Sequence, residues 1–242
     1  MFTSSRRARL VAAALRPLVA AKYPIALPDE YRYAHLSLAL IDTIYSIGAR
    51  YEGTHATVLR YARHQQLSPY HDAFDTRPPL ENQEPLSHLV QLYHALGIET
   101  MMTDVYQNRQ RTSTQSGIPK AEAVLQVAQL LQHYHINYFQ DLFRVAHNKQ
   151  FESQFKTVPG QRSGISLTYF WMLTGADDMI KPDRHILNCL CRAIKITSLS
   201  TTEAVSLLRD ATALLHVDYP LLTARALDYV IWESERQRVK SS

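Results

Sequence analysis

The chain has 242 residues, of which 46% are hydrophobic and 20% are charged, and it carries 7 Gly, 11 Pro and a formal net charge of +4. This composition excludes intrinsic disorder, a collagen-like repeat and a small disulfide-stapled domain. So few glycines disfavour β-sandwiches, propellers and glycine-rich doubly wound sheets, and they favour an all-helical chain. The length fits one large domain or two small lobes.

The first residues and the two cysteines indicate in which cellular compartment the protein resides. A basic stretch followed by an apolar run superficially resembles a signal peptide, but Arg16 and Pro17 interrupt the run. We therefore predict an amphipathic helix, with a targeting segment as the alternative. Cys189 and Cys191 point apart on a helix and form neither a disulfide framework nor a thiolate metal site. Because no apolar run is long enough to span a bilayer, we expect a soluble, cytoplasmic protein without a membrane partner.

Apolar residues recur at helical spacing through most of the chain. Residues 36–47 are almost uniformly apolar, which predicts a helix buried on most sides. Ser200 and Glu203 form a capping box before a later helix. Residues 67–84 and 109–118 have no period and are predicted loops. The predicted helices cover residues 4–21, 32–48, 54–65, 85–96, 99–108, 120–135, 138–145, 149–156, 164–174, 183–194, 202–215 and 219–236.

The segment 155–174 is the most informative one. An apolar helix end runs into Pro159 and Gly160, a short polar turn, Gly164 and a second apolar helix, which predicts a helix–hairpin–helix. Both glycines permit backbone conformations that are closed to residues with a Cβ, and they allow close approach to another surface. The N–H groups of the turn and of the next helix start, with the helix dipole, suit a phosphate.

Two motifs carry a family resemblance. Val158-Pro159-Gly160 and, further along, Pro182-Asp183-Arg184-His185-Ile186 stand at the spacing of two family motifs, a Leu-Pro-Gly-x-Gly hairpin and a Val-Asp-Thr-His-Val segment. In these residues the chain resembles the helix–hairpin–helix DNA glycosylase superfamily, which includes endonuclease III, the adenine glycosylases and the alkyl-base glycosylases. The resemblance is strong over residues 150–195 and only architectural elsewhere. It implies a two-lobed all-α fold with the active-site cleft between the lobes, and a catalytic role for Asp183.

The departures from the family pattern also carry information. Arg162 replaces the second hairpin glycine, unless Gly164 takes that role in a longer turn. Bifunctional members carry a Schiff-base lysine where this chain has Gly164, and no lysine occurs between Lys156 and Lys181. A water nucleophile is therefore implied. Nothing after Cys191 can ligate iron, which excludes an iron–sulfur cluster. We expect no cofactor, and a monovalent cation at the hairpin stays open.

Asp183 has two compatible roles. It precedes a helix and is a good N-cap, which is what most aspartates at such positions do. A carboxylate fixed at a helix start also stabilises the positive charge that develops on a sugar when an N-glycosidic bond breaks, and it orients a water molecule. The hairpin at the family's spacing favours catalysis.

The target nucleotide of a glycosylase must leave the base stack and enter a pocket. Candidate pocket residues lie near an early helix; they are Tyr45, Ser46, Arg50, Tyr51 and His55, with ordinary packing as the alternative. Candidate DNA contacts surround the hairpin and the aspartate; they are Lys156, Gly160, Gln161, Arg162, Ser163, Gly164, Lys181 and Arg184. The histidines lack the spacing of a zinc site, so we expect no metal.

Together these observations predict an all-α protein in which residues 34–177 form a lobe ending in the hairpin, while residues 1–33 and 178–242 form a second lobe with Asp183. We expect a monomer that acts on double-stranded DNA and hydrolyses a base to leave an abasic site. A non-catalytic DNA-binding module and a glycosylase-lyase with a lysine from elsewhere are the alternatives. The substrate stays open between a damaged base and a hypermodified viral base removed in antiviral defence.

Overall fold

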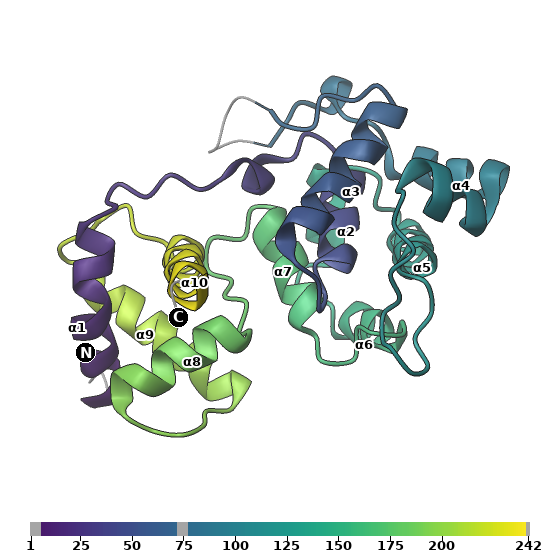
Figure 1. Cartoon of the computed structure of the whole chain (residues 1–242). Helices are drawn as coiled ribbons and strands as arrows, with labels where there is room; N and C mark the ends of the chain where they lie inside the picture. Colours follow the sequence, from purple (N-terminus) through teal and green to yellow (C-terminus); the bar gives the residue numbers. More distant parts are fainter. Residues whose placement is uncertain (1–5, 72–76, 241–242) are drawn as a thin grey trace. The chain divides into compact units, whose positions relative to one another are not determined.

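The computed structural model describes residues 6–71 and 77–240 of the chain, and within these ranges all regular secondary structure is helical (Figure 1). Two isolated β-bridges, Tyr33 with Tyr70 and Arg111 with Pro119, are the extended pairings of the described residues. The all-α class predicted from the sequence is confirmed. None of the helices in the described ranges is long and apolar enough to cross a membrane.

The chain divides into two compact units. One comprises residues 29–175 and is called here the central unit. The other, the terminal unit, comprises residues 1–28 together with 176–242. The sequence predicted one lobe over residues 34–177 and a second lobe over residues 1–33 and 178–242. Each unit has its own apolar interior and is described by itself.

The central unit is built around helix α2, which is buried at every residue. Its apolar sequence allows contact on all sides, and α2 packs against α3, α5 and α7 (Figure 1). The elements of this unit are η1 (Asp29–Arg32), α2 (Leu36–Tyr45), α3 (Tyr51–His64), η2 (Leu80–Asn82), α4 (Leu86–Thr100), η3 (Met101–Val105), α5 (Lys120–His133), η4 (Phe139–Arg144), α6 (Lys149–Thr157) and α7 (Ile165–Leu173).

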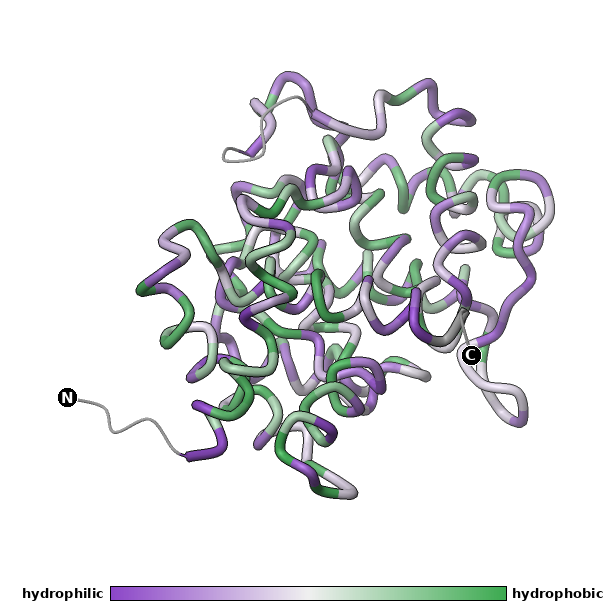
Figure 2. The backbone as a smooth tube through the Cα atoms, turned by 60° about the vertical axis from the view of Figure 1, so that its left-hand side comes forward, coloured by the Kyte–Doolittle hydropathy of each residue, from purple (hydrophilic) through white to green (hydrophobic). Residues whose placement is uncertain are grey.

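The terminal unit consists of α1 (Arg6–Ala20), α8 (Arg184–Ile194), α9 (Thr201–Leu215) and α10 (Ala224–Lys240). Helix α1 packs mainly on α9, and apolar residues at helical spacing on both helices enter one core, among them Val11, Leu15, Leu208 and Ala211. Hydrophobic and hydrophilic residues are interspersed along the chain, as the packing of amphipathic helices requires (Figure 2).

Several helix boundaries follow from local signals. The predicted capping box is confirmed, because Ser200 Oγ accepts from the N–H of Glu203 at 3.2 Å while Glu203 Oε2 accepts from the N–H of Ser200 at 3.1 Å. The last helix begins at Ala224, later than the predicted residue 219, where Thr223 Oγ1 accepts from the N–H of Ala226 at 3.0 Å. A hydroxyl that takes up an N–H of the first turn defines a helix start.

Two predicted helices have a different type in the structure. Gly97, with φ of +78°, breaks the helix that begins at Leu86, and residues 101–105 form a π-helix in place of the predicted α-helix over 99–108. Residues 139–144 form a 3-10 helix and not the predicted α-helix over 138–145. The first two residues of the predicted helix 4–21, and residues 72–76 of the predicted loop 67–84, lie outside the described residues.

Candidate functional site

Asp183 is the N-cap of α8. Its Oδ1 accepts from the N–H groups of His185 at 2.8 Å and Ile186 at 3.2 Å, so the predicted capping role is confirmed. Within the described residues, Oδ2 takes part in none of the hydrogen bonds. The side chain is half-buried. One carboxylate oxygen therefore fixes the group at the helix start, and the other is left for a water molecule or a ligand.

A second carboxylate, Asp228, lies close to this group and was not among the residues proposed from the sequence. It belongs to α10, is 4% exposed, and its Oδ1 accepts from the N–H of Lys181 at 2.9 Å. Burial and the neighbouring Asp183 carboxylate raise the pKa of Asp228 well above its usual range. A sequence signal existed, because Asp228 interrupts the apolar face that Leu227 and Ile231 continue.

The predicted hairpin joins α6 to α7. Its turn is closed by two backbone hydrogen bonds, from the N–H of Gln161 to the oxygen of Val158 at 2.9 Å and from the N–H of Gly164 to the oxygen of Gln161 at 3.0 Å. Gly164 is the N-cap of α7 in the left-handed conformation, with φ of +75°. The backbone N–H groups of Arg162 and Ser163 find no acceptor within the described part of the chain.

The space beside each hairpin glycine is taken up by the protein's own side chains. A Cβ at Gly160, where φ is +88°, would lie 2.6 Å from the Cβ of Thr112 in the loop 109–118. A Cβ at Gly164 would lie 2.9 Å from Lys156 Cε, the flexible part of that side chain. The close approach that we expected Gly160 to make with DNA is thus made with Thr112, because the two loops pack together.

The hairpin side chains differ in accessibility. Gln161 is completely buried, and its Oε1 accepts from the Ser166 hydroxyl. The Gln161 side chain therefore closes the turn from inside and offers no exposed surface to DNA. Arg162, Ser163 and Lys156 are exposed. These three remain available to a polyanion.

The other predicted contacts belong to the terminal unit. Arg184, the first residue of α8, is exposed, and Lys181 is half-buried with its N–H on Asp228. Arg192, further along α8, is ion-paired with Glu235 on α10 at 3.0 Å. Because Arg192 already has an acidic partner, Arg184 and Lys181 are the candidates for a DNA contact near Asp183.

The predicted base pocket separates into two groups. Tyr45 is completely buried, its ring packs against Tyr106 at 5.4 Å, and burial raises its pKa. The prediction that it reads a base is wrong, because it is a core residue. Ser46 donates to the oxygen of Thr43 at 3.1 Å and serves the end of α2. Arg50, just before α3, is exposed.

Tyr51 and His55, one turn apart on α3, belong to a different group, called here the aromatic cluster. Their rings stack at 5.9 Å, and His55 Nε2 lies 2.7 Å from the Tyr70 hydroxyl. Tyr70 in turn stacks on Tyr33 at 5.6 Å, and the Tyr33 hydroxyl donates to Asp42 Oδ2 at 2.7 Å. Tyr51, His55 and Tyr70 are half-buried. They form a partly accessible set of stacked rings.

Sequence reasoning missed three members of this cluster. Tyr33, Asp42 and Tyr70 come from separate segments, and only the antiparallel bridge between Tyr33 and Tyr70 brings the first and last of them together. Asp42 was visible as a charged residue within an otherwise apolar helix. Glu30 is a further acid beside Tyr51, and burial raises its pKa.

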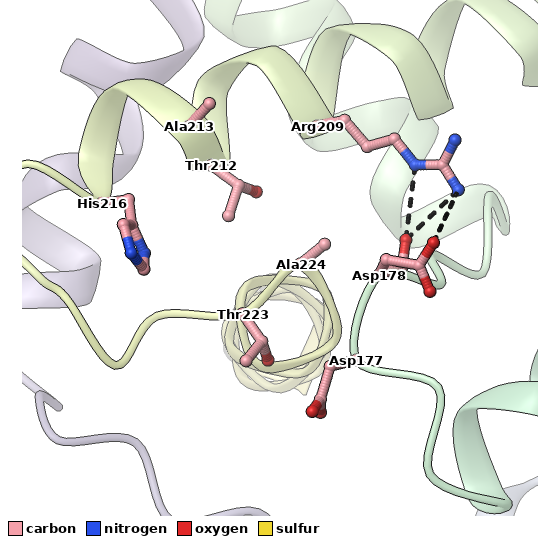
Figure 3. A pocket seen from close by; sticks show the side chains of 8 residues that line it. All are labelled: Asp177, Asp178, Arg209, Thr212, Ala213, His216, Thr223 and Ala224. Atoms are coloured by element: carbon pink, nitrogen blue, oxygen red, sulfur yellow. Dashed lines mark hydrogen bonds and ion pairs between the residues drawn. The ribbon is translucent and has the colours of Figure 1, made fainter.

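A separate cavity of about 650 Å³ lies on the terminal unit between α9, α10 and residues 177–178 (Figure 3). Asp178 and Arg209 pair at one edge, with 3.8 Å between their charged atoms, and Asp177 pairs with the buried Arg225 at 2.6 Å. The remaining lining is small or neutral. Because the charges at its edge are already paired, this cavity offers no evident ligand chemistry. Among the described residues, no group of three or more His, Cys, Asp or Glu side chains is arranged to hold a metal ion.

The fold and these sites define an all-α protein of two helical units with a capped, half-buried aspartate in one and a glycine hairpin in the other. Over residues 8–236 the chain matches the family described as a domain of unknown function (DUF8548), and it belongs to that family. A search of curated proteins and a search of solved structures gave no match.

Proposed function

We propose that this protein is a monofunctional DNA glycosylase with the two-lobed helix–hairpin–helix fold, which hydrolyses the N-glycosidic bond of a flipped base in double-stranded DNA and leaves an abasic site. The observation that carries the proposal is the Asp183 carboxylate, with Oδ1 fixed by two backbone N–H groups and Oδ2 left free by the described hydrogen bonds. A fixed carboxylate is preorganised to stabilise the positive charge of an oxocarbenium-like transition state.

The hairpin supplies the second part of the proposal. The backbone N–H groups of the exposed Arg162 and Ser163 have no acceptor among the described residues, and Lys156 lies over Gly164 at the start of α7. N–H groups, a helix N-terminus and an ammonium group together suit a phosphate oxygen. In this proposal the hairpin grips the DNA backbone and contributes no reading of sequence.

The aromatic cluster is the proposed contact for the extruded base. Stacked rings with a partly accessible face bind a base through its π-surface, and the nearby half-buried acid Glu30 is a potential hydrogen-bond partner for its edge. Tyr51 and His55 keep the role expected from the sequence, while Tyr45 does not. A damaged base and a hypermodified viral base removed in defence are both compatible with such a contact.

The test is base release from a panel of duplexes that carry damaged or naturally modified bases, with the free base detected by mass spectrometry. We expect release from at least one duplex by the wild-type chain and none by Asp183→Asn. Asp210→Asn, which alters an exposed aspartate on α9, is the matched control. No release from any duplex by the wild-type chain would contradict the proposal.

One observation favours a second function, a non-catalytic DNA-binding module. The two capping hydrogen bonds to Asp183 Oδ1 are by themselves a sufficient structural reason for an aspartate at this position. In that case the chain binds duplex DNA in a salt-dependent way, releases no base, and Asp183→Asn behaves like the wild type.

A further inference from the structure

Asp228 is a carboxylate on α10 with almost no access to solvent. It is 4% exposed, and its Oδ1 accepts the N–H of Lys181 at 2.9 Å. That hydrogen bond links α10 to the residues that lead into α8, immediately before Asp183. The same short segment also bends back on itself, because the N–H of Asp183 donates to the oxygen of Lys181 at 2.7 Å. The backbone entering Asp183 is therefore held at Lys181 by a side chain from another helix.

We propose that Asp228 is a positioning residue for Asp183: as a neutral carboxylic acid it holds the 181–183 backbone in place, so that the negative charge of this carboxylate pair resides on Asp183. The catalytic consequence rests on the proposed glycosylase function. The positioning itself does not, since it concerns only the hydrogen bond, the burial and the charges within the terminal unit.

The charges around Asp228 favour its neutral form. Of the described residues, Asp183 opposes ionisation of Asp228, while the N–H and the ammonium group of Lys181 favour it. Burial acts in the same direction as Asp183 and is the larger influence, so the pKa of Asp228 lies well above its usual range. On α10 itself, Arg225 is engaged with Asp177 and Glu235 with Arg192.

A neutral Asp228 has a direct physical consequence. Two ionised carboxylates in one partly buried site repel each other, and removing the proton from Asp228 would also leave a charge out of contact with water. Both effects disfavour the native arrangement of residues 181–183. With the proton on Asp228, its Oδ1 still accepts the Lys181 N–H, and Asp183 carries the single charge that faces a substrate.

The first experiment measures thermal unfolding of the full chain between about pH 5 and pH 9, a range across which a raised carboxyl pKa becomes visible. Asp228→Asn keeps the oxygen acceptor and cannot ionise, while Glu233→Gln removes a less buried carboxylate from the same helix as a control. Because the folded-state pKa is raised, wild-type stability is full at low pH and falls relative to Asp228→Asn as pH rises. A difference that does not vary with pH overturns the neutral form.

The second experiment measures hydrogen exchange of the Lys181 amide by NMR. Asp228→Asn should keep the amide protected, whereas Asp228→Ala, which lacks the acceptor, should exchange about tenfold faster or more. Unchanged protection in Asp228→Ala overturns the positioning contact. If Asp228→Ala does not fold, the Asp228→Asn comparison across pH still decides the proposal.

The third measurement is single-turnover base release from a duplex identified in the panel. Asp228→Ala should lower the rate about 10- to 100-fold with DNA affinity unchanged, because a misplaced carboxylate weakens the reaction and not the phosphate contacts. An unchanged rate overturns the catalytic consequence. If the wild-type chain releases no base at all, the glycosylase proposal fails, while the pH series and the exchange of Lys181 still decide whether Asp228 positions Asp183.

Discussion

The Cβ of Thr112 occupies the space that a side chain at Gly160 would need, 2.6 Å from the position of its Cβ. A residue from the loop 109–118 thus determines why the hairpin carries a glycine at this point. Gly164, the other left-handed glycine of the hairpin, meets only the flexible end of Lys156. The two glycines therefore differ in what a substitution does, although both have a positive φ.

Gly160→Ala is expected to lower the free energy of unfolding by about 2 to 6 kcal/mol, the sum of backbone strain and overpacking. Gly164→Ala should cost about 1 to 3 kcal/mol, from backbone strain alone. Urea denaturation of both variants measures the difference. In a Thr112→Gly background the cost of Gly160→Ala should shrink, and an unchanged cost would show that Thr112 is not the obstacle. Because its expected loss of stability is the smaller one, Gly164→Ala is the better probe of DNA affinity.

Asparagine and alanine at position 183 separate capping from catalysis. Asparagine caps a helix as well as aspartate, so Asp183→Asn should keep the stability of α8, whereas Asp183→Ala should lose about 0.5 to 2 kcal/mol. Both should lose base release and keep DNA affinity within a few fold, because the carboxylate acts on developing charge and not on phosphates. Turnover near the wild-type level in Asp183→Asn would reduce this residue to a cap.

Borohydride should trap no covalent complex with DNA, and the abasic products should be cleaved only after alkali or heat. The reason is that the resemblance to the helix–hairpin–helix glycosylases aligns Gly164 with the position where their bifunctional members carry a lysine. Lys120, the lysine whose pKa burial lowers to about 8, donates to the oxygens of Tyr45 and Ile47 and to Gln110, so its amine is already engaged. A trapped adduct that disappears in one lysine variant would identify a lyase.

Arg162→Ala should reduce the salt dependence of DNA binding, measured as the slope of log affinity against log salt concentration, by about one unit, the value for one phosphate contact. The exposed guanidinium lies on the hairpin, beside backbone N–H groups for which the described part of the chain supplies no acceptor. Arg109→Ala is the matched control, since Arg109 is exposed in the same unit and paired with Glu99 at 2.7 Å. Fluorescence anisotropy over a salt series measures the slope. Equal slopes for wild type and Arg162→Ala would mean that this side chain meets no phosphate.

Lys120 gives a prediction about stability that can be tested without an activity assay. Its Nζ bonds the carbonyl groups at the end of α2, so Lys120→Met should cost about 1 to 3 kcal/mol at neutral pH by leaving buried acceptors unpaired. Because the folded-state pKa of about 8 is below the ordinary 10.5, the unfolded chain binds more protons between these values. The wild type should therefore gain stability over this range as pH rises, and Lys120→Met should not. Urea midpoints at both ends of the range, with Lys149→Met as the exposed control, decide the point.

The sequence alone determined the features that depend on neighbours within one turn. Helical spacing placed most helices, the Ser200 and Glu203 box marked the start of α9, and Asp183 was recognised as a cap, because each signal needs only local hydrogen bonds or a local apolar face. The same reasoning predicted an all-helical chain from its few glycines and its apolar period.

Only the tertiary structure decided which side chains meet. Tyr45 and Tyr51 carry the same signal in the sequence, yet Tyr45 ends a helix buried on all sides, whereas Tyr51 begins α3 at a half-buried position. Likewise Thr112 meets Gly160, and Asp228 meets Lys181, across long stretches of chain. Such contacts depend on how whole helices and loops pack against one another, and the apolar surface that drives this packing is nondirectional, so no local pattern encodes the partner.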